Sequence, residues 1–189
     1  MPPMTTIHLR PELPGDAPAI EAVTVAAFEH AQHSSHTEQF IVRALRERGQ
    51  LAVSLVAMER RTEVDGDLDG EVQGIEQIAG HVAISPVTVD PAPAGGWYGL
   101  GPISVLPSCQ GKSIGAQLMR QALAQLRALP GTVGCVLLGE PAYYTRFGFR
   151  AEPALVLPGV PPEYFMALAF TGPVPAGTVQ YSDAFEAKA

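Results

Sequence analysis

The stretch VLPSCQGKSIG (residues 105–115) connects a predicted strand directly to a long predicted helix. The first backbone N–H groups of a helix have no partner within the helix, and the helix dipole is positive at that end. A helix start of this kind is a ready site for an anion. Gly111 and Gly115 would let a bulky phosphate approach the backbone, and Lys112 would add a positive charge. The stretch therefore indicates an anion site.

Two kinds of phosphate site compete for these residues. Gly111-Lys112-Ser113 looks like the end of a Walker A loop, but that motif needs a glycine five residues before its second glycine. Position 106 is Leu, so the P-loop is excluded. The stretch can still be a pyrophosphate-binding loop. The alternative is an ordinary connection between a strand and a helix without a ligand.

Hydrophobic periodicity and turn residues predict ten elements, in the order β, α, α, β, β, β, α, β, α, β. They are expected at about 6–10, 14–29, 35–49, 51–58, 78–87, 97–106, 113–129, 133–138, 141–147 and 163–170. Ser35 and Glu38 have the spacing of a capping box for the second helix. Gly99, Gly101 and Pro102 predict a β-bulge in their strand. The order indicates an α/β fold with one twisted mixed sheet and helices on its faces.

Composition limits the classes of protein and partner. The chain has 189 residues, 47% of them hydrophobic, which is enough for one packed core. We expect a single domain over 1–189, with a core over 5–170 and a C-terminal extension over 171–189. A net charge of −7 argues against nucleic acid as a partner. The sequence shows no signal-peptide pattern and no apolar run of ~20 residues, so we expect a cytoplasmic protein without a membrane partner.

A second motif, GEPAYYTRFGF, covers residues 139–149. With Gln110-x-x-Ser113-x-Gly115 and the segments 99–105 and 165–168, it resembles the GNAT superfamily of N-acetyltransferases, and most closely the YhbS-like branch. The resemblance implies a GNAT-type fold, a twisted and mostly antiparallel sheet with splayed strands. Ser113 departs from the family, which usually has Gly there. Its side chain would either crowd the phosphate or donate an additional hydrogen bond.

The resemblance also implies acetyl-CoA as the acyl donor, lying between the strands at 103–105 and 133–138. An exposed N–H near Ile103 would face the thioester oxygen and stabilise the oxyanion. The residues implied to bind acetyl-CoA are Ile103, Ser104, Val105, Gln110, Gly111, Lys112, Ser113, Ile114, Gly115 and Tyr144.

Proton transfer has two candidate residues. Tyr144 stands four residues before Gly148, which matches the family's general acid, and the alternative is that Tyr143 and Tyr144 only pack the short helix. His81 is the candidate base on the strand beside the cofactor strand. The alternatives are a buried structural histidine and deprotonation through water.

The acceptor site is implied at the break between the first two helices, where Glu29, His30 and His33 are the candidate binding residues. His30, His33 and His36 have a spacing that could suggest a metal, but the break at 34–35 disrupts helical ligand geometry, so no metal is expected. The acidic residues between Arg61 and Lys112 favour a solvated loop, with attraction of a cationic substrate as the alternative.

The implied function is transfer of an acetyl group to a primary amine, by direct attack in a ternary complex. The acceptor would be a small-molecule or peptide amine, and a homodimer is left open. The alternative is a catalytically silent module that binds acyl-CoA. Cys109 is expected to be a buried thiol, because no motif pairs it with a histidine.

Overall fold

The computed structural model describes residues 4–31, 34–62, 74–91 and 95–188. His33 lies outside these ranges, and so do the acidic residues from Glu63 to Glu71 that were predicted to form a solvated loop. The elements below are those of the described residues.

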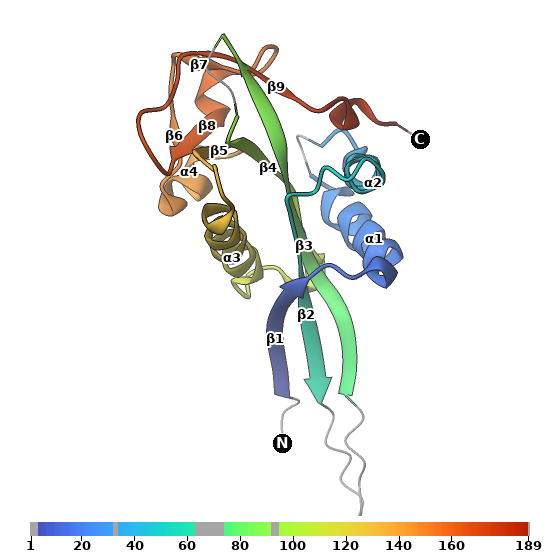
Figure 1. The fold of residues 1–189 in the computed structure, drawn as a ribbon. Helices are drawn as coiled ribbons and strands as arrows, with labels where there is room; N and C mark the ends of the chain where they lie inside the picture. The colour runs from blue at the N-terminus through green and yellow to red at the C-terminus, as the bar shows by residue number, and fades with distance from the viewer. Residues whose placement is uncertain (1–3, 32–33, 63–73, 92–94, 189) are drawn as a thin grey trace, which may run out of the picture.

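Seven strands of the described residues follow one another in the order β1-β2-β3-β4-β5-β8-β6 (Figure 1). They span Met4–Pro11 (β1), Val53–Thr62 (β2), Gly74–Asp90 (β3), Trp97–Val105 (β4), Gly134–Leu138 (β5), Arg150–Ala151 (β6) and Phe165–Ala169 (β8). β4 and β5 run parallel, and the other neighbours along this path are antiparallel. The predicted mixed, mostly antiparallel sheet is confirmed.

Helices cover both faces of the sheet. α1 (Ala17–Phe28) and α2 (Glu38–Glu47) lie on one side of the central strands, and α3 (Ile114–Ala128) lies on the other (Figure 1). The short helix α4 spans Pro141–Tyr144, and 3-10 turns span Pro14–Asp16, Pro107–Cys109, Thr145–Phe147, Pro162–Tyr164 and Asp183–Glu186.

β2 shows how the sequence supports two covered faces. Leu55 and Ala57 are buried in the core that includes α3, whereas Val56 and Met58 are buried in the core that includes α1. A strand with both faces covered carries a nearly continuous apolar run instead of an alternating one. This run therefore separates the core that includes α3 from the core that includes α1.

β4 and β5 separate after a short paired region. They pair only through Trp97–Gly99 and Gly134–Val136 among the described residues, so the two strands diverge towards their C-terminal ends. β4 also bulges, because Val82 of β3 faces Ile103 while Ile84 faces Leu100. The predicted splay and the predicted bulge are both confirmed.

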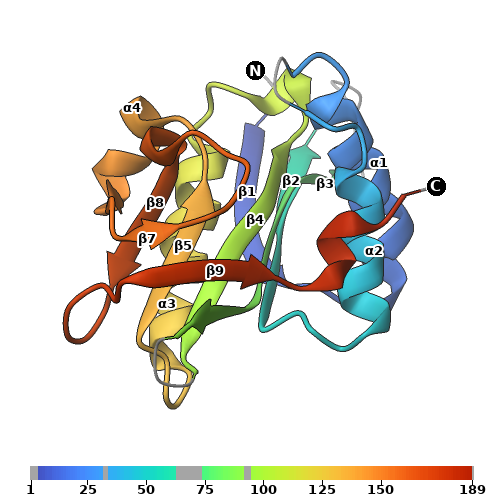
Figure 2. The ribbon, with the colours of Figure 1, turned by 90° about the horizontal axis from the view of Figure 1, so that it is seen from above.

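The chain after residue 170 crosses the molecule and adds a strand that the sequence analysis missed. β9 (Gly177–Tyr181) pairs with the end of β3 and with the two-residue β7 (Leu155–Val156), and it reaches from the β7–β8 side towards α2 (Figure 2). Ala184, just beyond β9, is buried against α2. Short strands next to Gly and Pro residues have too little periodicity to be predicted.

The capping prediction for the second helix was wrong in part. Glu38 does accept a hydrogen bond from the Ser35 N–H at 3.0 Å, but the Ser35 hydroxyl pairs with Thr37 at 2.6 Å. Thr37 therefore occupies the N-cap position, and α2 begins at Glu38. A local hydroxyl partner competed with the helix N–H groups.

None of the helices in the described ranges is both long enough and apolar enough to cross a bilayer.

Candidate active site

The start of α3 presents unpaired backbone N–H groups, as the sequence predicts. The Gln117 N–H donates to Ser113 O at 3.0 Å, so the N–H groups of residues 114–116 precede the first bond of the helix. No side chain caps them within the described structure. Gly111 and Ser113 have φ values of 77° and 62°, in the left-handed region. Ser113 holds a conformation that costs a non-glycine residue roughly 1–2 kcal/mol, which gives a physical reason for the family's usual glycine.

A cavity of about 330 Å³, here called the helix cavity, opens at this helix start. Its lining residues are Val105, Cys109, Gln110, Gly111, Ser113, Ile114, Gly115, Ala116, Tyr143 and Arg146. Five of the residues predicted at the helix start are among them, namely Gln110, Gly111, Ser113, Ile114 and Gly115.

The cation in the helix cavity differs from the predicted one. Lys112 does not line the cavity, and its Nζ lies 3.3 Å from Oε1 of the buried Glu59. Arg146 lines the cavity, with its guanidinium 4.6 Å from the centroid of the Tyr143 ring. Arg146 was not predicted from the sequence, although it lies in the second motif. An arginine on an aromatic ring is pre-organised for an anion.

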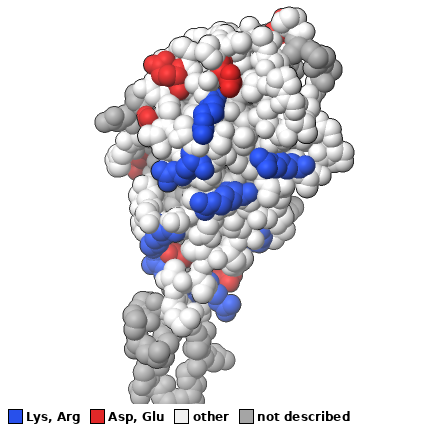
Figure 3. Space-filling model, turned by 90° about the vertical axis from the view of Figure 1, so that its left-hand side faces the viewer, with Lys and Arg blue, Asp and Glu red and all other residues white. Residues whose placement is uncertain are grey.

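The face on the α3 side carries several separate basic side chains, although the chain as a whole is acidic (Figure 3). The exposed arginines of α3 are Arg120 and Arg127, and they contact Phe147 and Phe170. Acidic side chains also lie on this face, and the basic ones favour the approach of an anionic ligand to the parts of the face where they lie.

A second cavity of about 240 Å³, here called the strand cavity, adjoins the first. Its lining residues are Ala27, Phe28, Ile103, Val105, Gln110, Gly115 and Tyr143. Val105, Gln110, Gly115 and Tyr143 line both cavities. A continuous wall therefore leads from the start of α3 along β4 to the end of α1.

The hydrogen-bond register of β4 determines which of its backbone groups face the diverging strands. The Leu106 N–H donates to Ala79 O of β3 at 2.8 Å. Backbone groups alternate along an antiparallel strand, so Ser104 also points to β3, whereas Ile103 and Val105 point away from it. Val105 O accepts a hydrogen bond from Gln110 Nε2 at 3.2 Å, which agrees with this register. β5 is not paired with this part of β4 in the described residues, which leaves the Ile103 N–H available.

The two tyrosines of the second motif lie differently. Tyr143 lines both cavities, whereas the Tyr144 ring packs in the α3-side core against Gly139, where any Cβ would clash with it. The rings meet edge to face, with centroids 4.9 Å apart. Burial, with a smaller contribution from Tyr143, raises the pKa of Tyr144 to about 12. Tyr144 therefore keeps its proton at neutral pH.

His81 lies inside the molecule and lines neither cavity. Its Nε2 is 2.8 Å from Ser54 Oγ and 3.6 Å from Glu12 Oε2, and its Nδ1 has no hydrogen-bond partner among the described residues. Burial lowers the pKa of His81, against the opposing effect of Glu12. Burial would raise the pKa of Glu12, but bonds from His81, Arg46 and Ser54 lower it to about 2. These groups form a buried polar cluster under α2.

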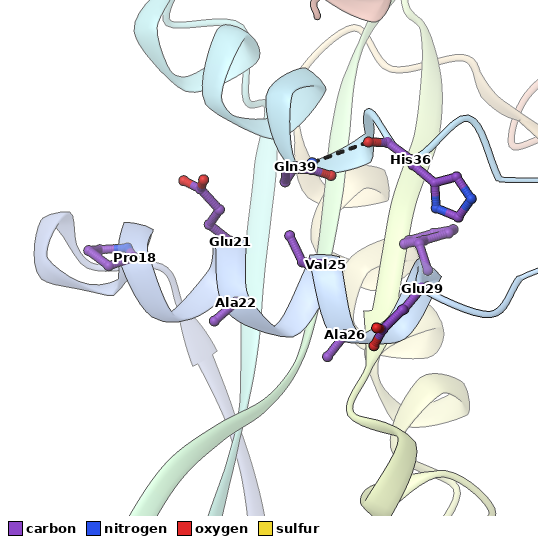
Figure 4. Close-up of a pocket in the computed structure, with 9 residues that line it drawn as sticks. Pro18, Glu21, Ala22, Val25, Ala26, Glu29, His36 and Gln39 are labelled. Atoms are coloured by element: carbon purple, nitrogen blue, oxygen red, sulfur yellow. Dashed lines mark hydrogen bonds between the residues drawn. The ribbon is translucent and has the colours of Figure 1, made fainter. Parts of the chain in front are cut away.

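A groove of about 770 Å³ runs along the outer side of α1 and is here called the α1 groove (Figure 4). Its lining residues are Pro18, Glu21, Ala22, Val25, Ala26, Phe28, Glu29, His36 and Gln39. Phe28 lines the strand cavity as well, so the groove ends beside it.

Only one of the three residues predicted to bind the acceptor lines the α1 groove within the described structure. Glu29 lies in the α1 groove, His30 does not line it, and His33 is outside the described residues. His36, at the same break, does line the groove. Glu21 is paired with Arg43 at 2.6 Å, whereas Glu29 has no ion pair within the described structure. No three His, Cys, Asp or Glu side chains of the described residues gather into a metal-binding group.

The sequence and the fold both match proteins of the GNAT acetyltransferase family. The family model for an acetyltransferase (GNAT) domain matches residues 66–151. The uncharacterized N-acetyltransferase YhbS of Escherichia coli K12 is 36% identical over 142 residues, which cover 75% of this chain and 72% of YhbS. The chain belongs to the GNAT family of acetyltransferases.

Solved GNAT structures extend the match to almost the whole chain. A GNAT acetyltransferase from Brucella melitensis, in complex with acetyl-CoA, superimposes with a TM-score of 0.75 at 46% identity and covers 95% of this chain and 98% of its own. E. coli YhbS, in complex with CoA, superimposes with a TM-score of 0.77 at 31% identity, covering 98% of this chain and 95% of its own. This GNAT protein is therefore an acyltransferase.

Proposed function

We propose that this protein transfers an acetyl group from acetyl-CoA to a primary amine. The observation that carries the proposal is the continuous wall between the uncapped start of α3 and the free edge of β4. One end offers N–H groups and Arg146 for a diphosphate, and the other offers a strand edge for the amide groups of pantetheine. The acetyl-CoA and CoA complexes of the two relatives support this assignment.

The acetyl carbonyl would lie beside the Ile103 N–H. The amine nitrogen attacks the carbonyl carbon directly, the C–S bond breaks, and the amide product forms without an acyl-enzyme. The negative charge on the carbonyl oxygen grows as the amine attacks, so an N–H fixed in place stabilises the transition state more than the ground state. The Ile103 N–H needs no rearrangement to do so, because β4 and its bulge hold it.

Tyr144 is the proposed general acid that protonates the departing CoA sulfur. A thiol of this kind has a pKa of roughly 8.5, by analogy with cysteine, and a proton donor assists its departure at neutral pH. The Tyr144 phenol carries its proton at neutral pH, both at the ordinary tyrosine pKa and at the raised value of about 12, so a proton donor is present. Tyr143, which lines both cavities, is proposed to contact the cofactor without donating the proton.

The amine must lose a proton before it attacks, since a lysine-like ammonium has a pKa of ~10.4. We propose that water takes this proton. The burial of His81 and its position outside both cavities favour a structural role for that residue, within the cluster with Glu12 and Ser54.

The α1 groove is the proposed binding site for the acceptor. Its wall is apolar along Ala22, Val25 and Ala26, and the Glu29 carboxylate stands near Phe28, at the end closest to the strand cavity. A primary amine with an apolar body matches both features, as a small molecule or as the end of a peptide. The ammonium would approach Glu29 first and then pass Phe28 to the thioester.

Calorimetry and a thiol assay test the proposed function. We expect acetyl-CoA and CoA to bind at micromolar concentration, and free CoA thiol to appear when apolar primary amines are added to the acetyl-CoA complex. Binding without release of thiol from any amine of a broad panel would instead indicate a catalytically silent acyl-CoA-binding module. No heat at millimolar acetyl-CoA, with folded protein, would contradict the proposal.

A further inference from the structure

Glu59 of β2 is a carboxylate with no exposed side-chain surface, and it lies beneath the loop that leads into α3. Gln77 Nε2 donates to its Oε2 at 2.7 Å, and Arg61 Nε does so at 3.0 Å. Lys112 Nζ donates to its Oε1 at 3.3 Å, and Cys109 Sγ lies 3.6 Å from Oε2. Two of these four donors, Cys109 and Lys112, come from the loop.

The carboxylate is charged in spite of its burial. Burial would raise the pKa of Glu59, but the bonds from Gln77, Arg61 and Lys112 outweigh burial and lower it. Removing a carboxylate from water is favourable only when its charge is compensated and its oxygens are bonded. Glu59 therefore presents a compensated charge to its cations, and the Lys112 contact joins a buried carboxylate to a half-exposed ammonium.

The loop needs a restraint. Gly111 and Ser113, on either side of Lys112, both have left-handed φ values, which their own backbone preferences do not enforce. Every residue from Cys109 to Ala116 except Lys112 lines the helix cavity. Lys112 is thus the residue of this run that leaves the cavity wall, and it ties the loop to the sheet through Glu59 together with Cys109.

We propose that Glu59 is a positioning residue for acetyl-CoA, which acts by holding Lys112 and so fixes the loop amides at the start of α3. This inference rests on the proposed function, since it assumes that the helix cavity takes the diphosphate. Lys112 acts here through Glu59 instead of acting as a direct phosphate ligand. Fixing the loop before binding removes an ordering penalty from association, so the effect falls on affinity for acetyl-CoA.

Lys112→Met and Arg61→Met form a matched pair for the test. The two side chains pair with the same carboxylate and are equally exposed, at 45% and 44%, but only Lys112 belongs to the loop. We expect Lys112→Met to raise KM for acetyl-CoA about tenfold with kcat unchanged, and Arg61→Met to leave KM within about twofold. Lys112→Arg, which can keep the contact with Glu59, should restore most of the affinity. Equal KM values for the two Met variants would overturn the inference.

Glu59→Gln separates the tether from a direct contact between Lys112 and phosphate. We expect it to raise KM as Lys112→Met does, and the double variant to be no weaker than either single one, because both changes remove the same contact. A direct phosphate contact predicts additive effects, or a lower KM once Glu59→Gln frees the lysine, and either result would overturn the inference.

Folding and cofactor binding are checked separately. Circular dichroism establishes whether Glu59→Gln is folded, and if it is not, the comparison of Lys112→Met with Arg61→Met decides alone. Absence of acetyl-CoA binding by the natural protein would contradict the proposed function. Binding by the natural protein that Lys112→Met leaves unchanged would contradict only the role of Glu59.

Discussion

The helix cavity and the α1 groove lie at opposite ends of one continuous wall, yet they are built from different parts of the chain. One segment, residues 109–116 without Lys112, supplies most of the residues that line the helix cavity, and the backbone N–H groups of residues 114–116 there have no partner within the helix. Residues of α1 and Glu29 just after it form most of the α1 groove, together with His36 from the segment before α2 and Gln39 from the first turn of α2. A site made of backbone is defined by local geometry, whereas a site made of side chains changes with each substitution. The donor end is therefore expected to be sensitive to backbone changes and the acceptor end to charge.

The largest expected effect is at the helix cavity. Gly111→Glu should abolish measurable binding of CoA, because it places bulk and negative charge where the diphosphate is proposed to lie. Gly131→Glu is the control, since Gly131 has the same φ of 77° and equally open surroundings but follows the end of α3. We expect it to bind CoA as the natural protein does in calorimetry. Equal loss of CoA binding in both variants would contradict the proposal that the diphosphate binds at the start of α3.

The next largest effect is expected from removing the proposed proton donor, Tyr144. Tyr144→Phe is expected to lower kcat by ~10²-fold with little change in the affinity for CoA, because the phenol is lost while the ring remains. Tyr143→Phe is the matched control and should keep kcat, as measured by release of CoA thiol. The reverse pattern would assign the general acid to Tyr143, the tyrosine that lines both cavities.

Protonation of the polar cluster under α2 should change the free energy of unfolding and leave kcat unchanged. The folded-state pKa of His81 is lowered, so below a pH of about 6.5 the unfolded chain binds a proton that the folded chain does not. The free energy of unfolding should therefore decrease as the pH is lowered below about 6.5. His81 contributes up to about 1.4 kcal/mol per pH unit to this decrease. Denaturant titrations between pH 7 and 5 measure the slope. Glu12, Arg46 and Asp16 also act on His81.

His81→Gln is the comparison for that slope. It removes the titrating group, and we expect a smaller loss of stability between pH 7 and 5 than in the natural protein, with kcat retained at neutral pH. A natural protein that becomes more stable as pH falls would show that His81 is charged and paired with Glu12. If His81→Gln lowered kcat without lowering stability, His81 would be assigned as the general base.

The smallest expected effect is at the α1 groove. Glu29→Gln should raise KM for a cationic amine about two- to fivefold at low salt, because an exposed charge contributes only about 0.2–1 kcal/mol. The difference should shrink as salt is added. Glu152→Gln, an exposed residue that does not line the groove, makes the same change in net charge and should leave KM unaltered. An equal effect of both variants would indicate general attraction by the acidic protein.

The contrast between backbone and side chains also explains which residues the sequence could predict. Gly111, Ser113 and Gly115 were predicted because a strand that turns into a helix exposes the same amides in any fold. The bulge in β4 was predicted for a similar local reason. Arg146 and Phe28 were missed at the cavities because only packing brings the second motif and the end of α1 to the start of α3.

The sequence by itself determined the order of the main helices and strands, the anion-binding helix start and the relation to GNAT enzymes, because these follow from local periodicity, turn chemistry and contiguous motifs. Only the tertiary structure decided that Lys112 turns to Glu59, that Tyr143 lines the wall while Tyr144 packs beside it, and that β9 pairs with the end of β3. Those outcomes depend on contacts between residues far apart in the chain. The energy of such contacts exists only once the sheet has brought the residues together.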